Sequence, residues 1–296
     1  MPLERYSRVL SGNELPNFKI SREQGDLSQK AGEAEILLHS CALCEHNCRV
    51  DRHTTAGVCG VGAEMRVASD FIHLGEEPEL VPSYTIFFAG CNMKCQYCQN
   101  ADISQNALAG HPVKPWSLAY MIDSHPTAKN VNFVGGEPTP HLAGILRALT
   151  EVKSNIPVVW NSNMYLSEKG MSLLDGAVDV WLTDFKYGND KCAKRLSKVG
   201  NYWKAVTRNH KLAETTKYPS ELLIRHLALP GHLECCTKPI IDWISENLNN
   251  PRINILDQYR PQYEAHKYKE INRPLKPEEH GEAVRYAKKL GLTNIV

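Results

Sequence analysis

The chain has 296 residues, of which 42% are hydrophobic and 23% are charged, and its formal net charge is +1. This balance excludes a disordered or collagen-like chain and gives no electrostatic reason to expect a nucleic-acid partner. The first residues lack the apolar core of a signal peptide and no apolar run reaches the length of a membrane span, so we expect a cytoplasmic protein without a membrane partner. The length suits one large α/β barrel or about two domains.

The cysteines are unevenly distributed. Seven of the ten fall in two short groups, at 41–59 and 91–98. In a reducing compartment, such clustering is typical of metal binding rather than of disulfides. The other three, Cys192, Cys235 and Cys236, are expected to be buried as small apolar residues.

The amino-terminal part is polar. Residues 1–35 show no strong periodicity, so we expect irregular structure there, with a helix near 29–39. Residues 65–82 alternate in polarity and end in a proline-containing segment, whose prolines are expected to form a linker into the first strand. The sequence therefore predicts an extension over 1–80, containing a cysteine-rich metal-binding segment at 41–62, followed by a second domain over 81–296.

The cysteine-rich segment has the spacing C-x2-C-x3-C-x10-C, formed by Cys41, Cys44, Cys48 and Cys59. Four thiolates within about twenty residues are enough for one closed metal site, and both zinc and an auxiliary iron–sulfur cluster accept four thiolates. His46 could replace one cysteine or lie in a solvated turn. A dithiol redox pair is a third interpretation.

The central motif follows an apolar run at 84–88. The run ends at a glycine, and Cys91, Cys95 and Cys98 follow with C-x3-C-x2-C spacing. This pattern predicts a strand that leads into a metal-binding loop. Three thiolates suit a cubane iron–sulfur cluster with one iron left free better than they suit a closed structural zinc site.

This stretch, with Tyr97 before the third cysteine and Asn100 two residues after it, resembles the radical S-adenosylmethionine (SAM) superfamily. Within that superfamily the chain is most similar to the pyruvate formate-lyase-activating-enzyme-like group. The resemblance implies a [4Fe-4S] cluster on the three cysteines of the motif and S-adenosyl-L-methionine on the free iron. It also implies that Tyr97 packs against the adenine and that Asn100 hydrogen bonds the cofactor.

Further strands are expected after this loop. Apolar runs place these strands at 130–134, 157–160, 178–182, 221–229 and 253–256. Helices are expected between the strands, at 116–124, 141–154, 190–198, 202–216 and 239–248, and after the last strand, at 277–290. Six strand–helix units in this order predict an incomplete (β/α)6 barrel of the TIM type, as the radical SAM resemblance also implies.

Three polar motifs follow the carboxyl ends of these strands, where a barrel places its site. By resemblance, Gly135, Gly136 and Glu137 hold the amino group of the cofactor's methionine part. The segment Asn161-Ser162-Asn163 is expected near its ribose and carboxylate, although each residue could instead cap a helix that begins near residue 167.

The third motif is Asp184 with Lys186. Residues two apart on a strand share a face, so both side chains can point into the barrel. The resemblance implies that they reach the cofactor, whereas a purely structural buried ion pair is the alternative. Arg225 and His226 are adjacent on a later strand, so at most one of them is expected to face the cavity.

These patterns predict an enzyme that cleaves S-adenosylmethionine reductively to a 5′-deoxyadenosyl radical, which removes hydrogen from a substrate. The resemblance favours a glycyl residue of a partner enzyme as that substrate. Radical modification of another protein side chain or of a small metabolite is one alternative, and a non-catalytic metal-binding interaction protein is another. The chain has no flavin or nicotinamide fingerprint, so flavodoxin or ferredoxin is the expected electron donor.

Overall fold

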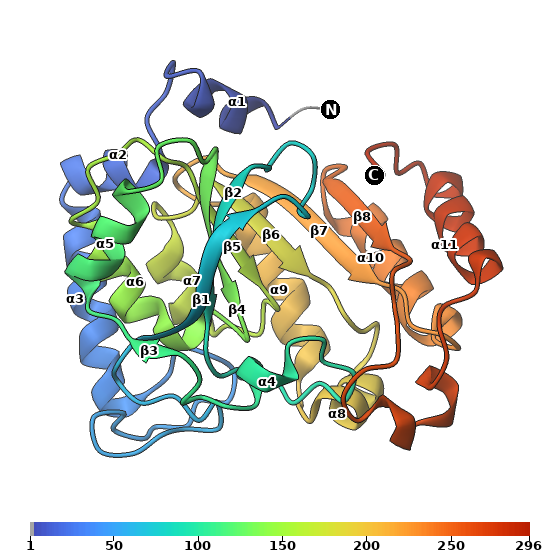
Figure 1. The fold of residues 1–296 in the computed structure, drawn as a ribbon. Helices are drawn as coiled ribbons and strands as arrows, with labels where there is room; N and C mark the ends of the chain where they lie inside the picture. Colours follow the sequence, from blue (N-terminus) through green and yellow to red (C-terminus); the bar gives the residue numbers. More distant parts are fainter. Residues whose placement is uncertain (1–2) are drawn as a thin grey trace.

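The structure is a computed structural model that describes residues 3–296, and its centre is one eight-stranded sheet (Figure 1). The strand order is β3-β1-β2-β4-β5-β6-β7-β8. The strands are β1 Arg66–His73, β2 Ser83–Phe88, β3 His111–Pro112, β4 Asn130–Gly135, β5 Val158–Ser162, β6 Val180–Asp184, β7 Glu221–Leu227 and β8 Arg252–Leu256. β2 and β4 to β8 run parallel, each beside the next in the chain, whereas β1 is antiparallel to β2 and β3. The predicted α/β class is confirmed, and the incomplete barrel stays a prediction.

Helices connect and cover the strands. They are α1 Glu4–Leu10, α2 Asn17–Glu23, α3 Asp26–Ile36, α4 Ala101–Ser104, α5 Pro115–Asp123, α6 Leu142–Leu149, α7 Glu168–Leu174, α8 Asp190–Ser197, α9 Tyr202–Glu214, α10 Lys238–Asn247 and α11 Pro277–Lys289. A π-helix over Leu233–Thr237 precedes α10. Among residues 3–296, no helix is both long and apolar enough to cross a membrane.

The middle strands are buried on both faces. All five residues of β5 are buried, and the side chains of Trp160 and Trp181 are inaccessible to solvent. Helices on the faces of a parallel sheet produce this pattern, so such strands appear in the sequence as continuous apolar runs. For this reason the six parallel strands could be predicted close to their observed bounds.

The expectation of irregular structure was wrong for residues 3–25, most of which form α1 and α2, whereas the helix expected near 29–39 is present as α3 and the 3-10 helix after it. Polar side chains attach α1 and α2 to the sheet. Arg5 Nη1 donates a 2.8 Å bond to the buried carboxylate of Asp179, and Asn17 Nδ2 donates a 2.7 Å bond to the Val178 carbonyl. The helices are therefore held by buried polar contacts that hydrophobic periodicity does not reveal.

The alternating residues that begin at 65 form a strand, and the proline-containing segment expected to be a linker follows it. The strand is β1, which pairs with β2 from Val67 to His73. The cysteine-rich segment lies between α3 and β1 and contacts the rest of the molecule, since the Glu45 amide donates to the Tyr165 carbonyl over 3.3 Å. The division of the chain at residue 80 stays a prediction.

Candidate active site

A cavity of about 670 Å³ opens at the carboxyl ends of the parallel strands. Because these ends meet at one edge of the sheet, motifs far apart in the sequence come together there. All the residues predicted for the three-cysteine motif and for the cofactor line this cavity: Cys91, Cys95, Tyr97, Cys98, Asn100, Gly135, Gly136, Glu137, Asn161, Ser162, Asn163, Asp184 and Lys186. Their roles toward a cluster or cofactor stay predictions.

The loop that carries the three cysteines leaves β2 and is held from α8. The amides of Lys94 and Gln96 donate to the carbonyls of Ser197 and Leu196, over 2.9 and 2.8 Å. The Ser197 hydroxyl also donates to Cys95 Sγ over 2.9 Å. The carboxyl end of α8 therefore fixes the conformation of the loop.

The other two sulfur atoms also have polar neighbours. The Met93 amide donates to Cys91 Sγ over 3.3 Å, and Cys98 Sγ lies 3.2 Å from the Ser104 hydroxyl. Burial raises the pKa of Cys91 well above its ordinary value and raises that of Cys95 to about 11. Thiols in such surroundings are neutral in the absence of a metal, and binding a cluster as thiolates releases their protons.

Tyr97 and Asn100 flank the third cysteine. Tyr97 is buried, with the rings of Tyr187 and Tyr259 edge-on at 6.4 and 5.9 Å. Asn100 is the residue before α4, and its carbonyl accepts the Ser104 amide over 2.8 Å. An aromatic ring and an amide are thus both available at the cavity wall.

Two glycines at the end of β4 allow a close approach to β2 and to the residues that follow it. Gly135 has φ of +126°, and a Cβ atom there would lie 2.1 Å from the Phe88 nitrogen. A Cβ on Gly136 would lie 2.2 Å from the Gly90 carbonyl oxygen. Since real Cβ atoms do not approach backbone atoms so closely, only glycine fits at both positions.

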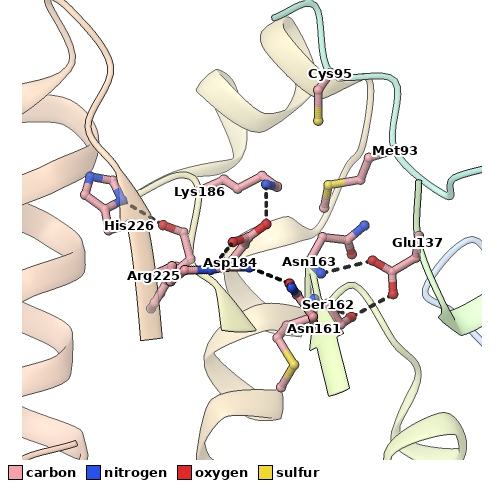
Figure 2. Close-up of polar contacts among 12 residues, drawn as sticks. Met93, Cys95, Glu137, Asn161, Ser162, Asn163, Asp184, Lys186, Arg225 and His226 are labelled. Carbon is pink, nitrogen blue, oxygen red and sulfur yellow. Dashed lines mark hydrogen bonds and ion pairs between the residues drawn. The ribbon is translucent and has the colours of Figure 1, made fainter. Parts of the chain in front are cut away.

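Glu137 is buried, and the protein itself supplies donors to both its carboxylate oxygens. Oε1 accepts the Thr139 hydroxyl over 2.5 Å. Figure 2 shows the other two bonds: Oε1 accepts the Ser162 hydroxyl over 2.7 Å, and Oε2 accepts the Asn163 amide over 3.0 Å. Burial raises the pKa of Glu137, and these bonds oppose that shift. The carboxylate therefore joins the ends of β4 and β5 in addition to lining the cavity.

The Asn161-Ser162-Asn163 segment contacts β7 and the cysteine loop in addition to Glu137. Asn161 Oδ1 accepts a 2.5 Å bond from Arg225, and Asn163 Nδ2 donates a 2.8 Å bond to Asn92 Oδ1 inside the cysteine loop. The alternative that this segment caps the next helix is not supported, because Ser167 itself accepts the Gly170 amide as the cap of α7.

Asp184 and Lys186 both line the cavity, although β6 ends at Asp184 and Lys186 lies beyond the strand. Lys186 Nζ donates a 2.7 Å bond to Asp184 Oδ2, and Arg225 Nε lies 3.6 Å from Oδ1 (Figure 2). Burial alone would raise the pKa of Asp184, but the two cations lower it below its ordinary value. His226 points away from the cavity and contacts the Phe185 carbonyl at 2.7 Å, so Arg225 is the member of its pair that lines the site.

Sequence reasoning missed several residues of this site. Glu76, from the segment after β1, pairs with Arg225 at 2.8 Å and lines the cavity. Asn92 and Ser197 support the cysteine loop from within and from α8. The sequence shows the charges of Glu76, Glu77 and Arg225. No spacing rule, however, pairs residues that are so far apart in the chain.

The second group of cysteines is also gathered in space. Burial, together with the nearby thiols of Cys59, Cys41 and Cys48, raises the pKa of Cys44 to about 12. His46 is half-buried in a turn, and its Nε2 lies 2.6 Å from the Asn92 carbonyl. The cysteine-rich segment therefore lies against the loop of the first motif. Its metal stays a prediction, and so does the replacement of a cysteine by His46 as a metal ligand.

Comparison with known proteins places this site in a family. The family model described as the Radical SAM superfamily matches residues 85–244, which include the cysteine loop and the motifs of β4, β5 and β6. The chain belongs to the Radical SAM superfamily. Members of this superfamily use a [4Fe-4S] cluster and S-adenosylmethionine.

Individual relatives add little about the substrate. The chain is 47% identical to "Uncharacterized protein MJ0674" of Methanocaldococcus jannaschii over 98% of this chain and 87% of that protein. Among solved structures, SuiB of Streptococcus suis bound to precursor peptide SuiA is 16% identical with a TM-score of 0.49, covering 69% of this chain and 46% of that one. QueE from Escherichia coli is 15% identical with a TM-score of 0.33, covering 56% and 85%.

The residues present fit the groups that the family uses. Three thiols on one loop provide the ligands of a cluster with one free iron, and the cavity beside them offers glycine backbone, amides, a carboxylate and an ammonium group. When bound, the cluster and S-adenosylmethionine supply a reductive cleavage that yields a 5′-deoxyadenosyl radical. The protein's own part is to fix the cysteine loop through α8 and to hold the strand ends together through Glu137 and Arg225.

Proposed function

We propose that this radical SAM enzyme acts on a polypeptide and removes a hydrogen atom from a backbone glycine of a partner enzyme, which leaves a glycyl radical. The observation that carries the proposal is the position of β1 beside the cavity. Ser69, Phe71 and His73 of this strand line the cavity, and the aromatic ring of Phe71 stacks on Phe87 at 5.2 Å.

The outer edge of β1 is suited to an extended peptide. β3 pairs with β1 at Arg66 and Val67, and among residues 3–296 no strand pairs with the rest of this edge. Phe71 is 44% exposed and Leu74, just after the strand, is 72% exposed. An incoming segment can add to such an edge through main-chain hydrogen bonds, with its side chains on the exposed apolar surface.

The proposal includes an external electron donor. Reduction of the cluster requires one electron, and flavodoxin or ferredoxin is the class of donor that we propose. The cysteine-rich segment would hold either zinc or an auxiliary iron–sulfur cluster next to the cysteine loop. Counting iron and zinc in reconstituted wild type and in a Cys41→Ala/Cys44→Ala double variant distinguishes the two metals.

The first experiment establishes turnover. Protein reconstituted without oxygen is mixed with S-adenosylmethionine and dithionite, and 5′-deoxyadenosine is measured. The second step adds an extract from cells grown on deuterated glycine, separated by size into polypeptides and small molecules. Deuterium in the 5′-deoxyadenosine with the polypeptide fraction alone supports the proposal.

Other results reject it. Deuterium transfer, or stimulated turnover, with the small-molecule fraction alone would favour modification of a metabolite. Stimulation by polypeptides without deuterium transfer would favour another side chain. A fully loaded protein that forms no 5′-deoxyadenosine would favour a non-catalytic metal-binding protein.

A further inference from the structure

Three side chains outside the cavity form a second kind of metal-ligand cluster. The ligand atoms of Cys192, His232 and Cys235 all lie within 4.8 Å of one another. Cys192 Sγ is 3.8 Å from Cys235 Sγ, too far for a disulfide bond. Cys192 and Cys236 are buried, as expected, whereas Cys235 is exposed, and Cys192 and Cys235 are neighbours in space. They are 43 residues apart, so only the fold brings them together.

We propose that Cys192, His232 and Cys235 form a zinc site that fastens α8 to the connection between β7 and α10. With Zn–S bonds of about 2.3 Å, two thiolates on a tetrahedral zinc ion lie roughly 3.8 Å apart. The observed separation of the two sulfur atoms therefore needs no rearrangement. Two thiolates and one imidazole are a donor set that zinc prefers over hard cations such as magnesium.

The imidazole is oriented for this role. His232 is buried, and its Nδ1 lies 3.0 Å from the Pro230 carbonyl, which accepts a hydrogen bond from it. That bond fixes the tautomer and leaves Nε2 as the ligand, an arrangement that zinc-binding histidines commonly have. Arg195 Nη2 lies 3.4 Å from Nε2, and the same guanidinium also pairs with Glu270, so it can stay on Glu270 when the metal binds.

The backbone on both sides of the cluster is preorganised. Asn189 accepts the Cys192 amide over 2.8 Å as the cap of α8, and its Nδ2 donates to the Cys235 carbonyl over 2.6 Å. The residues from 233 to 237 form a π-helix, a rare turn that is frequent at functional sites. One asparagine thus holds the two ligand-bearing segments in register.

Cys236 provides an internal comparison. Its Sγ is 3.9 Å from Cys235 Sγ, but it lies outside the group whose ligand atoms are all within 4.8 Å of one another. It is 1% exposed, whereas Cys235 is on the surface. We therefore assign the three protein ligands without it, and the fourth position to solvent.

The site is placed to support the cysteine loop. Cys192 lies on the same helix as Ser197, whose hydroxyl and carbonyl hold the loop at Cys95 and Lys94. Zinc at one end of α8 would restrict movement of the helix relative to the sheet, and hence of the loop at its other end. The role is positional, since the site does not line the cavity.

The test uses the full chain, with iron–sulfur centres reconstituted, and Zn²⁺ alone as the probe. Zinc per chain is measured in wild type, in Cys192→Ser/Cys235→Ser and in the matched control Cys236→Ser. We expect the double variant to bind one zinc ion fewer than wild type and the control to bind the same number. Equal zinc in wild type and double variant, or equal loss in the control, would overturn the assignment.

A second measurement needs no variant. Alkylation of native wild type by iodoacetamide is followed at Cys235 by peptide mass spectrometry, with and without added Zn²⁺. Protection of Cys235 by at least tenfold supports the site. An unchanged alkylation rate, or a Cys192–Cys235 disulfide in protein kept under reducing conditions, would reject it. Neither measurement depends on S-adenosylmethionine cleavage. A negative result would therefore reject the zinc site without bearing on the radical SAM reaction.

Discussion

The Ser162 hydroxyl donates a 2.7 Å hydrogen bond to Oε1 of Glu137, and this contact joins the carboxyl end of β5 to the residue that follows β4. The same carboxylate accepts the Asn163 amide on its other oxygen. Because neighbouring parallel strands share no covalent connection at this edge, a buried carboxylate is an effective way to fix their relative position. The cavity wall between the two strands depends on it.

Replacing Glu137 tests this connection. In Glu137→Gln, an NH₂ group replaces one oxygen, so either the Asn163 amide or the pair of hydroxyls loses an acceptor. We expect the free energy of unfolding to fall by about 1–3 kcal/mol, the usual effect of leaving a buried polar group unsatisfied. Urea denaturation measures it. The exposed Glu151→Gln should change stability little, and an equal effect of both variants would contradict the assigned role.

The sequence allowed the six parallel strands and the cavity-lining motifs to be predicted for a physical reason. Strands buried on both faces are continuous apolar runs, and their carboxyl ends carry the polar residues of the site. In contrast, α1 depends on the contact between Arg5 and Asp179, and the Cys192 cluster depends on packing of α8 against the π-helix. Such tertiary contacts have no local sequence signal.

The charges around Asp184 predict a pH dependence. Lys186 and Arg225 lower the pKa of Asp184 in the folded state, so its ionised form stabilises the protein above the ordinary aspartate pKa of about 4. That contribution is lost as the pH falls through the lowered folded pKa. Urea midpoints between about pH 5 and pH 3 should therefore depend less steeply on pH in Asp184→Asn than in wild type. The exposed Asp257→Asn should retain the wild-type slope, and identical slopes in all three proteins would be evidence against the predicted shift.

Removing one sulfur ligand should abolish the first metal site. In Cys95→Ala, only two thiols of the cysteine loop remain, and a cubane cluster then lacks two protein ligands. We expect the iron content to fall by about one cluster per chain and the formation of 5′-deoxyadenosine to fall at least 100-fold, as the loss of this cofactor ends the chemistry that it carries. Leu108→Ala, at a residue that is 75% exposed, is the control. Full activity of Cys95→Ala would place the cluster elsewhere.

The Ser197 hydroxyl should affect the cluster more subtly. Hydrogen bonds to cluster sulfur atoms stabilise the reduced, more negative state, so losing the 2.9 Å bond to Cys95 Sγ lowers the reduction potential. We expect Ser197→Ala to bind as much iron as wild type but to need a stronger reductant, as followed by electron paramagnetic resonance during a redox titration. Ser172→Ala, at an exposed serine, should behave as wild type. A raised potential in Ser197→Ala would show that the hydroxyl acts differently.

Gly136 and Gly32 have different surroundings, which predict opposite effects of replacing each by alanine. In Gly136→Ala, the new Cβ would lie 2.2 Å from the Gly90 carbonyl oxygen and 2.8 Å from the Ser104 Cα. Both are backbone atoms that cannot rotate away, so β4 and the loop must separate. We therefore expect the free energy of unfolding to fall by about 3 kcal/mol, together with weaker cluster retention.

Gly32 lies inside α3, where a Cβ meets nothing within 4 Å. Gly32→Ala should therefore raise the free energy of unfolding by about 0.5–1 kcal/mol, because alanine restricts the unfolded chain and favours the helix. Urea denaturation of both variants, with iron counted after reconstitution, measures the contrast. If Gly136→Ala were as stable as wild type and held its cluster equally well, the strand and the loop would not be in contact as described.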